Sequence, residues 1–173
     1  MEITKATLQH LDAICRITDQ AKAQLAGLGI DQWQRGYPNR EAWIDDIEQS
    51  VAYAAIENGQ VLGAASILPG IEPSYCEIEG AWHSDAPYLS VHRVCVADGS
   101  KGKGIAGLLF AYSFRLAKEQ GISSVRIDTH RGNIPMQHAI AKSGFSYCGV
   151  IHLVGGVDHG HERIAFDRLT DER

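Results

Sequence analysis

The segment from Val96 to Phe114, VADGSKGKGIAGLLFAYSF, constrains the fold most, because a glycine-rich loop joins the end of an apolar strand to an apolar helix. Gly102, Gly104 and Gly107 lack a Cβ atom, so a ligand oxygen can approach the backbone closely. The first N–H groups of the helix have no partner inside it, and its dipole and two loop lysines add positive charge. The loop therefore indicates a phosphate site, although a glycine-rich turn can also be purely structural.

Two phosphate-binding patterns compete for this loop. Residues 102–107, GKGIAG, spell G-x-G-x-x-G, and Asp128 ends a second strand about twenty residues later, as in a dinucleotide-binding fold. In that fold the first glycine directly follows the strand, whereas the polar segment ADGSK separates Val96 from Gly102. Only 66 residues follow Gly107, too few for a long series of βα units. A dinucleotide-binding oxidoreductase stays an alternative.

The second pattern is the Gln/Arg-x-x-Gly-x-Gly/Ala pyrophosphate loop of the GCN5-related N-acetyltransferases (GNAT), which KGKGIA at residues 101–106 resembles with lysine in the first place. YLSVHRVCVAD looks like the family's fourth strand, and RIDTHRGNIPMQHAIAKSGFSYCGVI looks like its fifth strand, fourth helix and sixth strand. The resemblance covers Val91 to Ile151. It implies a single GNAT-like acetyltransferase domain over residues 1–173, an α+β fold in α/β/α layers. A mixed, mostly antiparallel sheet of six to seven strands would be flanked by about four helices.

Size and charge are compatible with this resemblance. A chain of 173 residues and 18.9 kDa suits one domain. The net charge of −5 argues against a general nucleic-acid binder. Val91 to Arg131 carries seven Lys/Arg and three Asp/Glu, a balance of +4, which leaves −9 elsewhere and suits an anionic cofactor beside a cationic acceptor. Without a long apolar run or a signal-like start, we expect a cytoplasmic protein that does not enter a membrane.

Neither the cysteines nor the histidines near the C-terminus form a convincing metal pattern. The four cysteines are widely spaced without a C-x-x-C pair, so core thiols are expected: Cys15, Cys76, Cys95 and Cys148. Four polar residues lie close together near the C-terminus: Asp158, His159, His161 and Glu162. They could be mistaken for a metal site, but their spacing is typical of a polar hairpin turn. No metal is predicted.

Hydrophobic periodicity and turn residues predict the order of the elements. EITKA predicts a first strand, and a helix is expected from Thr7 to about Gly27. EAWIDDIEQ predicts a short helix, and VAYAAIENGQVLGAASIL predicts two strands about an Asn58-Gly59 turn. The remaining expected segments are irregular chain at 69–87, a strand at 88–97, a helix at 104–120, a parallel strand over SSVRIDT, a helix at 133–143, and an antiparallel pair over SYCGVIHLV and HERIAFDRL.

The resemblance implies acetyl-CoA as co-substrate and assigns its binding residues. Pantetheine would pair with the backbone of the fourth strand at Val94, Cys95 and Val96. The pyrophosphate would lie on Lys101, Gly102, Lys103, Gly104, Ile105 and Ala106. Asn133 matches the family's asparagine, which often contacts the pantetheine arm, although a role as helix N-cap is equally compatible with the sequence.

Acetyl transfer to an amine needs a base, because an amine is protonated at neutral pH. Glu79 is the first choice, since an acidic residue before the fourth strand also attracts a cation. Alternatively, Glu79 is a solvated carboxylate in a loop, without a catalytic role. His92 lies beside the cofactor strand and is chemically suited to the task, but could be purely structural. Glu77 and His83 are further candidates.

The proton donor for the leaving thiol is less clear from the sequence. Many members of the family use a tyrosine seven residues after the capping asparagine, and this count from Asn133 reaches Ile140. Tyr147, His138 or water would then donate the proton. Alternatively, the protein is a catalytically weak CoA-binding or sensing module.

Aromatic residues in two loops predict the acceptor pocket. These are Trp33, Tyr37 and Trp82, with His83 beside them, and each could instead anchor its loop to the core. The expected partner is a small-molecule or peptide amine, bound without nucleic acid or membrane, and a homodimer stays open. We expect direct transfer of the acetyl group in a ternary complex. The sequence does not identify the amine that accepts it.

Overall fold

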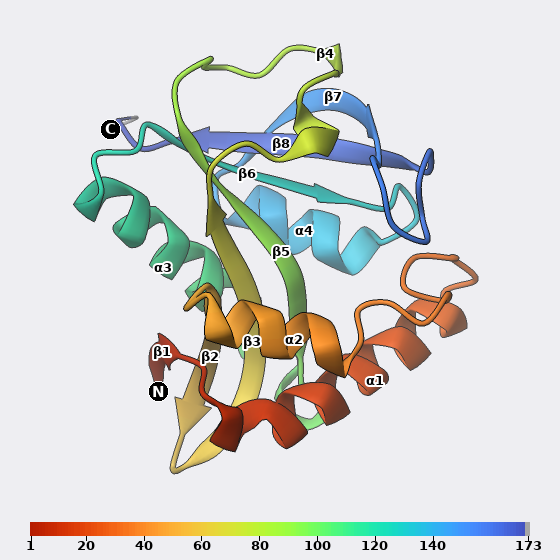
Figure 1. Cartoon of the computed structure of the whole chain (residues 1–173), viewed down its shortest axis with the longest axis vertical. Helices are drawn as coiled ribbons and strands as arrows, with labels where there is room; N and C mark the ends of the chain where they lie inside the picture. The colour runs from red at the N-terminus through yellow and green to blue at the C-terminus, as the bar shows by residue number, and fades with distance from the viewer. Residues whose placement is uncertain (172–173) are drawn as a thin grey trace.

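The computed structural model describes residues 1–171, which form one eight-stranded sheet in the order β1-β2-β3-β5-β6-β8-β7-β4 (Figure 1). Only the β5–β6 pairing is parallel among the described strands. The expected mixed, mostly antiparallel sheet is therefore confirmed. The strands are β1 (Glu2–Lys5), β2 (Ala52–Glu57), β3 (Gln60–Pro69), β4 (Glu79–Gly80), β5 (Tyr88–Val96), β6 (Ser124–Thr129), β7 (Ser146–His152) and β8 (Glu162–Leu169).

The expected number of six to seven strands is wrong by one, because β4 lies inside the segment predicted to be irregular. Its two residues pair with β7 at Glu79↔Val150 and Gly80↔Gly149. A Cβ atom on Gly80 would overlap the carbonyl oxygen of Cys148, so the two backbones can approach only because this residue is glycine. Two residues are too few to produce an alternating hydrophobic pattern.

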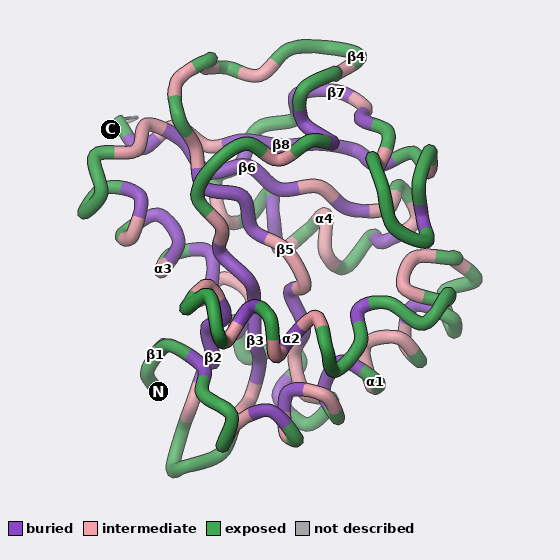
Figure 2. Tube along the Cα trace, in the orientation of Figure 1, coloured by how far each residue is buried: buried purple, intermediate pink, exposed green. Residues whose placement is uncertain are grey.

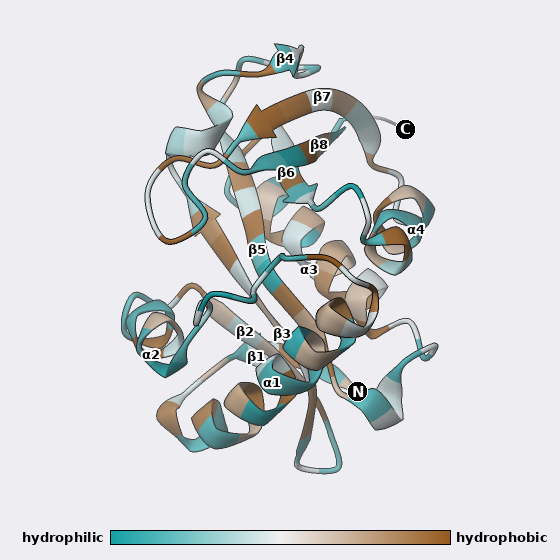
Figure 3. Cartoon of the chain, turned by 90° about the vertical axis from the view of Figure 1, so that its right-hand side faces the viewer, coloured by the Kyte–Doolittle hydropathy of each residue, from teal (hydrophilic) through white to brown (hydrophobic). Residues whose placement is uncertain are grey.

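Four α-helices cover the two faces of the sheet, as expected. The helices α1 (Leu11–Gly27) and α2 (Arg40–Glu48) pack on one face, where Ile14 and Trp43 are fully buried. The helices α3 (Ile105–Glu119) and α4 (Ile134–Lys142) pack on the other (Figure 1). In Figure 3, α1 carries apolar and polar residues around its turns, as a helix with one buried face requires.

The main core lies between the sheet and the pair α3 and α4. Leu109, Phe110 and Ile140 from these helices are fully buried against Leu89 and Val125 of the sheet. Burying each such side chain contributes roughly 1.5–3 kcal/mol. Figure 2 shows the burial along the central strands and the exposure of the chain around β4. This core fixes the two parallel strands that border the site.

The two parallel strands separate at their carboxyl ends. Pairing of β5 with β6 runs from Tyr88↔Ser124 to Val91↔Ile127 and stops, although β5 continues to Val96. At the same level the β3–β5 register shifts, and Arg93 adopts a φ of 55°, the left-handed region that non-glycine residues rarely occupy. This bulge turns the end of β5 away from β6. A gap therefore opens in the sheet.

This topology shows that the dinucleotide-binding alternative is wrong. A doubly wound domain needs a succession of parallel strands, whereas the described sheet contains one parallel pair.

None of the helices within residues 1–171 combines the length and apolar character needed to cross a membrane.

Candidate functional site

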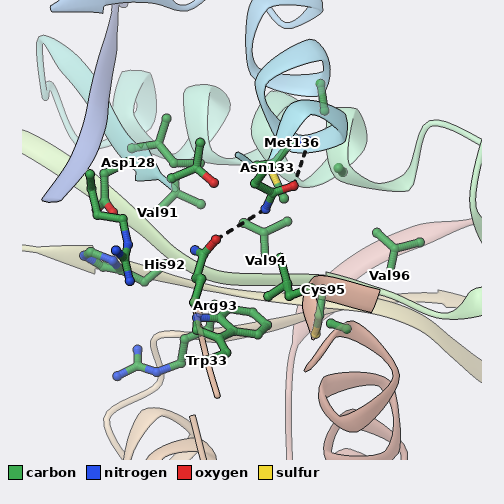
Figure 4. Close-up of a pocket in the computed structure, with 18 of the residues that line it drawn as sticks. Trp33, Val91, His92, Arg93, Val94, Cys95, Val96, Asp128, Asn133 and Met136 are labelled. Carbon is green, nitrogen blue, oxygen red and sulfur yellow. Dashed lines mark hydrogen bonds between the residues drawn. The ribbon is translucent and has the colours of Figure 1, made fainter. Parts of the chain in front are cut away.

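A cavity of about 1020 Å³ occupies the gap between β5 and β6 and reaches both faces of the sheet. Gln24 and Leu25 of α1 line it on one side, and Met136 and Ala139 of α4 line it on the other. Residues 91–96 of β5 run between them (Figure 4). The cavity thus brings together segments that are far apart in the sequence.

The glycine loop forms one end of this cavity and fits an anion. Gly104 is the N-cap of α3 with a φ of 77°, and no side chain caps the helix. Among residues 1–171, the N–H groups of Gly102 and Gly104 have no hydrogen-bond partner. Such free N–H groups at a helix N-terminus bind phosphate. Of the six loop residues predicted for the pyrophosphate, five line the cavity and Lys103 does not: Lys101, Gly102, Gly104, Ile105 and Ala106.

The end of β5 contributes Val94, Cys95 and Val96, all of which line the cavity. The side chain of Cys95 is buried, with its Sγ 3.9 Å from Thr18 Oγ1. Burial raises the pKa of the Cys95 thiol to about 12, more than its hydrogen bonds with Thr18 and the backbone of Ala64 lower it. The thiol therefore stays protonated and packed in the core. The prediction of core thiols is right for Cys95 and Cys148, but Cys15 is only half-buried and Cys76 is exposed. A ligand would meet Cys95 through its backbone.

Asn133 connects the two sides of the cavity. Its side-chain oxygen accepts a hydrogen bond from the N–H of Met136 at 3.3 Å and so caps α4. Its side-chain nitrogen donates to Oε1 of Gln32, in the loop after α1, at 3.5 Å (Figure 4). The asparagine is thus both a helix cap and part of the cavity wall.

His92 lines the cavity beside an acidic residue that we had not predicted. Its Nε2 lies 3.2 Å from Oε2 of Glu72. Burial alone would raise the pKa of Glu72, but His92 and the N–H of Ser74 outweigh it and lower the pKa to about 2. Glu72 is therefore anionic at neutral pH. The Tyr75 ring stacks on His92 with centroids 5.9 Å apart, which restricts the imidazole.

The bulge residue Arg93 is held by polar contacts. Its Nη1 lies 3.0 Å from Oδ2 of Asp46 in α2, and its Nη2 donates to the hydroxyl of Tyr37. The guanidinium carbon also lies 5.4 Å from the centre of the Tyr37 ring. Tyr37 and Trp33, both predicted for the acceptor, line the cavity. These contacts offset the strain of the left-handed backbone at Arg93.

The other predicted site residues lie outside the cavity lining: Glu79, Tyr147, Trp82 and His83. Glu79 lies on the short edge strand β4, where 73% of its side chain is exposed. Tyr147 is 57% exposed and its ring packs against Phe166. The structure therefore does not bring the first-choice base or the tyrosine to the cofactor loop.

Trp82 and His83 instead hold the chain near β8. The indole N–H of Trp82 donates to the carbonyl of Tyr75 at 3.1 Å. His83 donates its backbone N–H to Oδ2 of Asp167, and its Nδ1 lies 2.6 Å from Oδ1 of the same carboxylate. Cys148 Sγ lies 3.4 Å from that Nδ1. The side chains of Asp167 and Cys148 thus both lie within hydrogen-bonding distance of Nδ1 of His83.

Four buried polar atoms of the cavity lining make no hydrogen bond. Within residues 1–171, six buried side-chain atoms are in this class, and four of them belong to lining residues: His92 Nε2, Arg93 Nε, Thr129 Oγ1 and Asp158 Oδ1. Two of the four still face a side chain that can carry the opposite charge, because His92 Nε2 lies 3.2 Å from Glu72 and Asp158 Oδ1 lies 3.8 Å from Arg35. Buried polar atoms are nearly always paired, and a polar ligand would supply partners for Arg93 Nε and Thr129 Oγ1. Asp158, from the predicted hairpin turn, and Arg163, in β8, also line the cavity.

Sequence reasoning missed Glu72 and considered Asp128 only as a dinucleotide ligand. Glu72 lies in the irregular segment, where no pattern distinguishes it from Glu77 and Glu79. Asp128 ends the second parallel strand, and polar residues at the carboxyl ends of parallel strands often face a ligand. The position of Asp128 at the end of this strand could therefore have identified it as a candidate site residue.

Comparison with known proteins agrees with this architecture. The sequence profile of the Acetyltransferase (GNAT) family matches residues 12–145. A GNAT family acetyltransferase from Streptococcus agalactiae is 34% identical, with a TM-score of 0.86 over 99% of this chain and 96% of that one. A putative acetyltransferase from Staphylococcus aureus is 22% identical, with a TM-score of 0.74 over 99% and 100% of the two chains.

Two curated relatives are named streptothricin acetyltransferase. The protein from Streptomyces lavendulae is 27% identical over 61% of this chain and 49% of its own length. The one from Escherichia coli is 25% identical over 65% and 59%, respectively. The chain thus spans about half the length of the curated relatives it matches. The profile match and the structural similarity over nearly the whole chain show that this protein belongs to the acetyltransferase (GNAT) family.

Proposed function

We propose that the protein transfers an acetyl group from acetyl-CoA to a primary amine by direct attack in a ternary complex. The observation that carries this proposal is the single cavity in which the glycine loop and the separated end of β5 meet. The loop offers free N–H groups to the pyrophosphate, and β5 offers unpaired backbone groups to the pantetheine amides. When bound, acetyl-CoA supplies a thioester carbonyl carbon as the electrophile.

The charge distribution in the cavity favours a basic cofactor end and an acidic acceptor end. Lys101, Lys142 and Arg168 line the part near α3 and α4. Glu72 and Asp128 line the part beyond β5. An anionic co-substrate and a cationic amine would therefore bind at different ends of one cavity.

His92 is the base in this proposal. The Glu72 carboxylate lies beside Nε2 of His92 and favours the tautomer with the proton on Nε2. The lone pair on Nδ1 is then free to accept a proton from the amine. Tyr75 keeps the ring in place by stacking. The bound ammonium first loses one proton to His92, which frees the nitrogen lone pair. Attack on the thioester then forms the N–C bond and breaks the S–C bond. The nitrogen loses its second proton as the amide forms, and this proton balances the one that the thiolate takes up.

The leaving thiolate needs no tyrosine in this scheme. Ile140, at the family's tyrosine position, is fully buried in the core. A free thiol has a pKa of about 8.5, so water can protonate the thiolate without a dedicated acid.

Thiol release from acetyl-CoA, measured with a panel of primary amines that begins with streptothricin, tests the transfer. Streptothricin comes first because two relatives carry its name. Calorimetry with CoA and with NAD tests the site separately, and we expect heat only with CoA. CoA binding without thiol release for any amine would contradict the transfer and support a sensing module.

A further inference from the structure

Three carboxylates of the described residues line the cavity, and two of them have basic side chains within 4 Å. Glu72 faces His92 at 3.2 Å. Asp158 has three basic groups within 4 Å: Arg35 and Arg163 at 3.8 Å and His161 at 3.9 Å. Asp128 differs, because among residues 1–171 no Lys, Arg or His nitrogen lies within 4 Å of its carboxylate. It is the one carboxylate of this lining without a basic side chain at that distance.

Asp128 lies where the acceptor would meet the thioester. Val91↔Ile127 is the last pair between β5 and β6, so the next residues in register are His92 and Asp128. Val91 and Ile127 point into the core under α3 and α4. Because side chains alternate along a strand, His92 and Asp128 face the opposite side. They therefore border the gap from neighbouring strands on the same face (Figure 4).

Tyr75 fixes the orientation of this carboxylate. Its hydroxyl donates to Oδ2 of Asp128 at 2.7 Å. Burial, followed by the charge of Asp128, raises the pKa of Tyr75 well above its usual range, so the phenol remains a donor. The same ring stacks on His92 and lies 5.0 Å from that of Trp82. One buried tyrosine thus contacts both Asp128 and the proposed base, and within residues 1–171 the Oδ1 atom of Asp128 accepts no hydrogen bond.

We propose that Asp128 binds the ammonium group of the acceptor and thereby restricts the substrate class to alkylamines, which are protonated at neutral pH. This inference rests on the proposed function, because it assigns the acceptor end of that site. A partly buried carboxylate without a cation is unfavourable, and an alkylammonium ion supplies the missing charge and up to three N–H donors. An arylamine of similar shape is uncharged at this pH and gains no such attraction.

The test uses benzylamine, an alkylammonium probe, and aniline, its uncharged counterpart, titrated calorimetrically into the CoA-saturated protein at pH 7. We expect wild-type protein to prefer benzylamine at least tenfold. Asp128→Asn keeps an oxygen for Tyr75 but removes the charge, and should weaken benzylamine binding at least tenfold without changing the affinity for CoA. Glu119→Gln, which removes one exposed charge near the far end of α3, should bind like wild type.

Equal affinity of wild type for the two probes, no benzylamine binding, or unchanged benzylamine affinity in Asp128→Asn would overturn the role of Asp128. The wild-type preference can be measured even if the variant does not fold. Thiol release separates this inference from the proposed function. Charge-dependent benzylamine binding without turnover of any amine would support the role of Asp128 but reject acetyl transfer. Turnover that is unchanged in Asp128→Asn would support acetyl transfer but reject the role of Asp128.

Discussion

Two adjacent side chains at the bulge of β5 have different tasks, one in the proposed chemistry and one in the shape of the cavity. His92 and Arg93 are adjacent, yet His92 faces Glu72 whereas Arg93 reaches Asp46 on α2. Under the proposed function, the contact with Glu72 orients His92 as the proton acceptor. The contact with Asp46 holds Arg93 in its strained backbone conformation. These two roles can be separated by substitution.

Replacing His92 by Gln should lower kcat at least about a hundredfold, because general base catalysis contributes roughly 10²–10⁴. Glu72→Gln should lower kcat less, about tenfold, since the imidazole remains but loses its orienting charge. Steady-state kinetics with a productive amine measures both. Glu79→Gln serves as the control and should stay within about twofold, because its side chain is exposed outside the cavity. A larger loss in Glu79→Gln than in His92→Gln would return the base to Glu79.

Replacing Asp46 by Asn should destabilise the protein by about 3 kcal/mol, because the buried guanidinium of Arg93 loses its anionic partner. The KM for acetyl-CoA should rise as the bulge relaxes. Urea unfolding and steady-state kinetics give the two values. Asp12→Asn removes an exposed ion pair with Arg40 and should cost less than about 1 kcal/mol. Equal unfolding midpoints for the two variants would show that the Arg93 contact does not hold the bulge.

At the scale of elements, the glycine loop and α3 form the end of the cavity that the proposed function assigns to the phosphates. Gly104 is the first candidate for substitution, and a Cβ atom there meets no atom within 4 Å. Its left-handed backbone, rather than a lack of space, requires glycine.

Gly104→Ala should weaken CoA binding at least tenfold while costing about 1–2 kcal/mol of stability, because alanine disfavours the left-handed conformation that aims the N–H groups. Calorimetry and thermal unfolding measure the two effects. Gly121→Ala is a matched control at the other end of α3, with a φ of 66° and equally open surroundings. It should lose similar stability and keep its CoA affinity. Parallel losses of affinity would place the phosphate elsewhere.

Elements with strong local signals could be predicted from the sequence, and those that depend on distant contacts could not. The Asn58-Gly59 hairpin, the cap at Asn133 and the α3 loop follow from turn and capping chemistry encoded within a few residues. The strand β4 exists only because Gly80 meets Gly149, which is 69 residues away in the sequence. Local patterns carry no information on such an encounter.

The site was partly predictable for the same reason. The β5 and glycine-loop residues that line the cavity belong to continuous motifs, so the sequence could point to them. Glu72 reaches His92 through the fold of an irregular segment, and nothing in its neighbouring sequence sets it apart from Glu79. Sequence reasoning therefore served the cofactor end better than the acceptor end.

For the whole molecule, the stability against unfolding should depend on acid pH through Glu72. The folded pKa of about 2 lies below the unfolded value of about 4.5, so its contribution is fully present above pH 4.5 and is lost as the pH falls through 2. The loss should reach at most about 3 kcal/mol. Urea unfolding between pH 5 and 2 measures it, and Glu72→Gln should flatten this slope whereas Glu119→Gln should not. An unchanged slope in Glu72→Gln would mean that other carboxylates cause the acid sensitivity.

Because the cavity between β5 and β6 has lining residues from both faces of the sheet, the proposed reaction centre can be approached from either face. Under the proposed function, each reactant can arrive through its own entrance and each product can leave by the route its precursor took. The acetylated amine then need not wait for the bulky nucleotide to depart. Order of binding becomes a matter of affinity rather than of steric access, and a change at one entrance can alter acceptor choice while the other still admits the same acetyl donor.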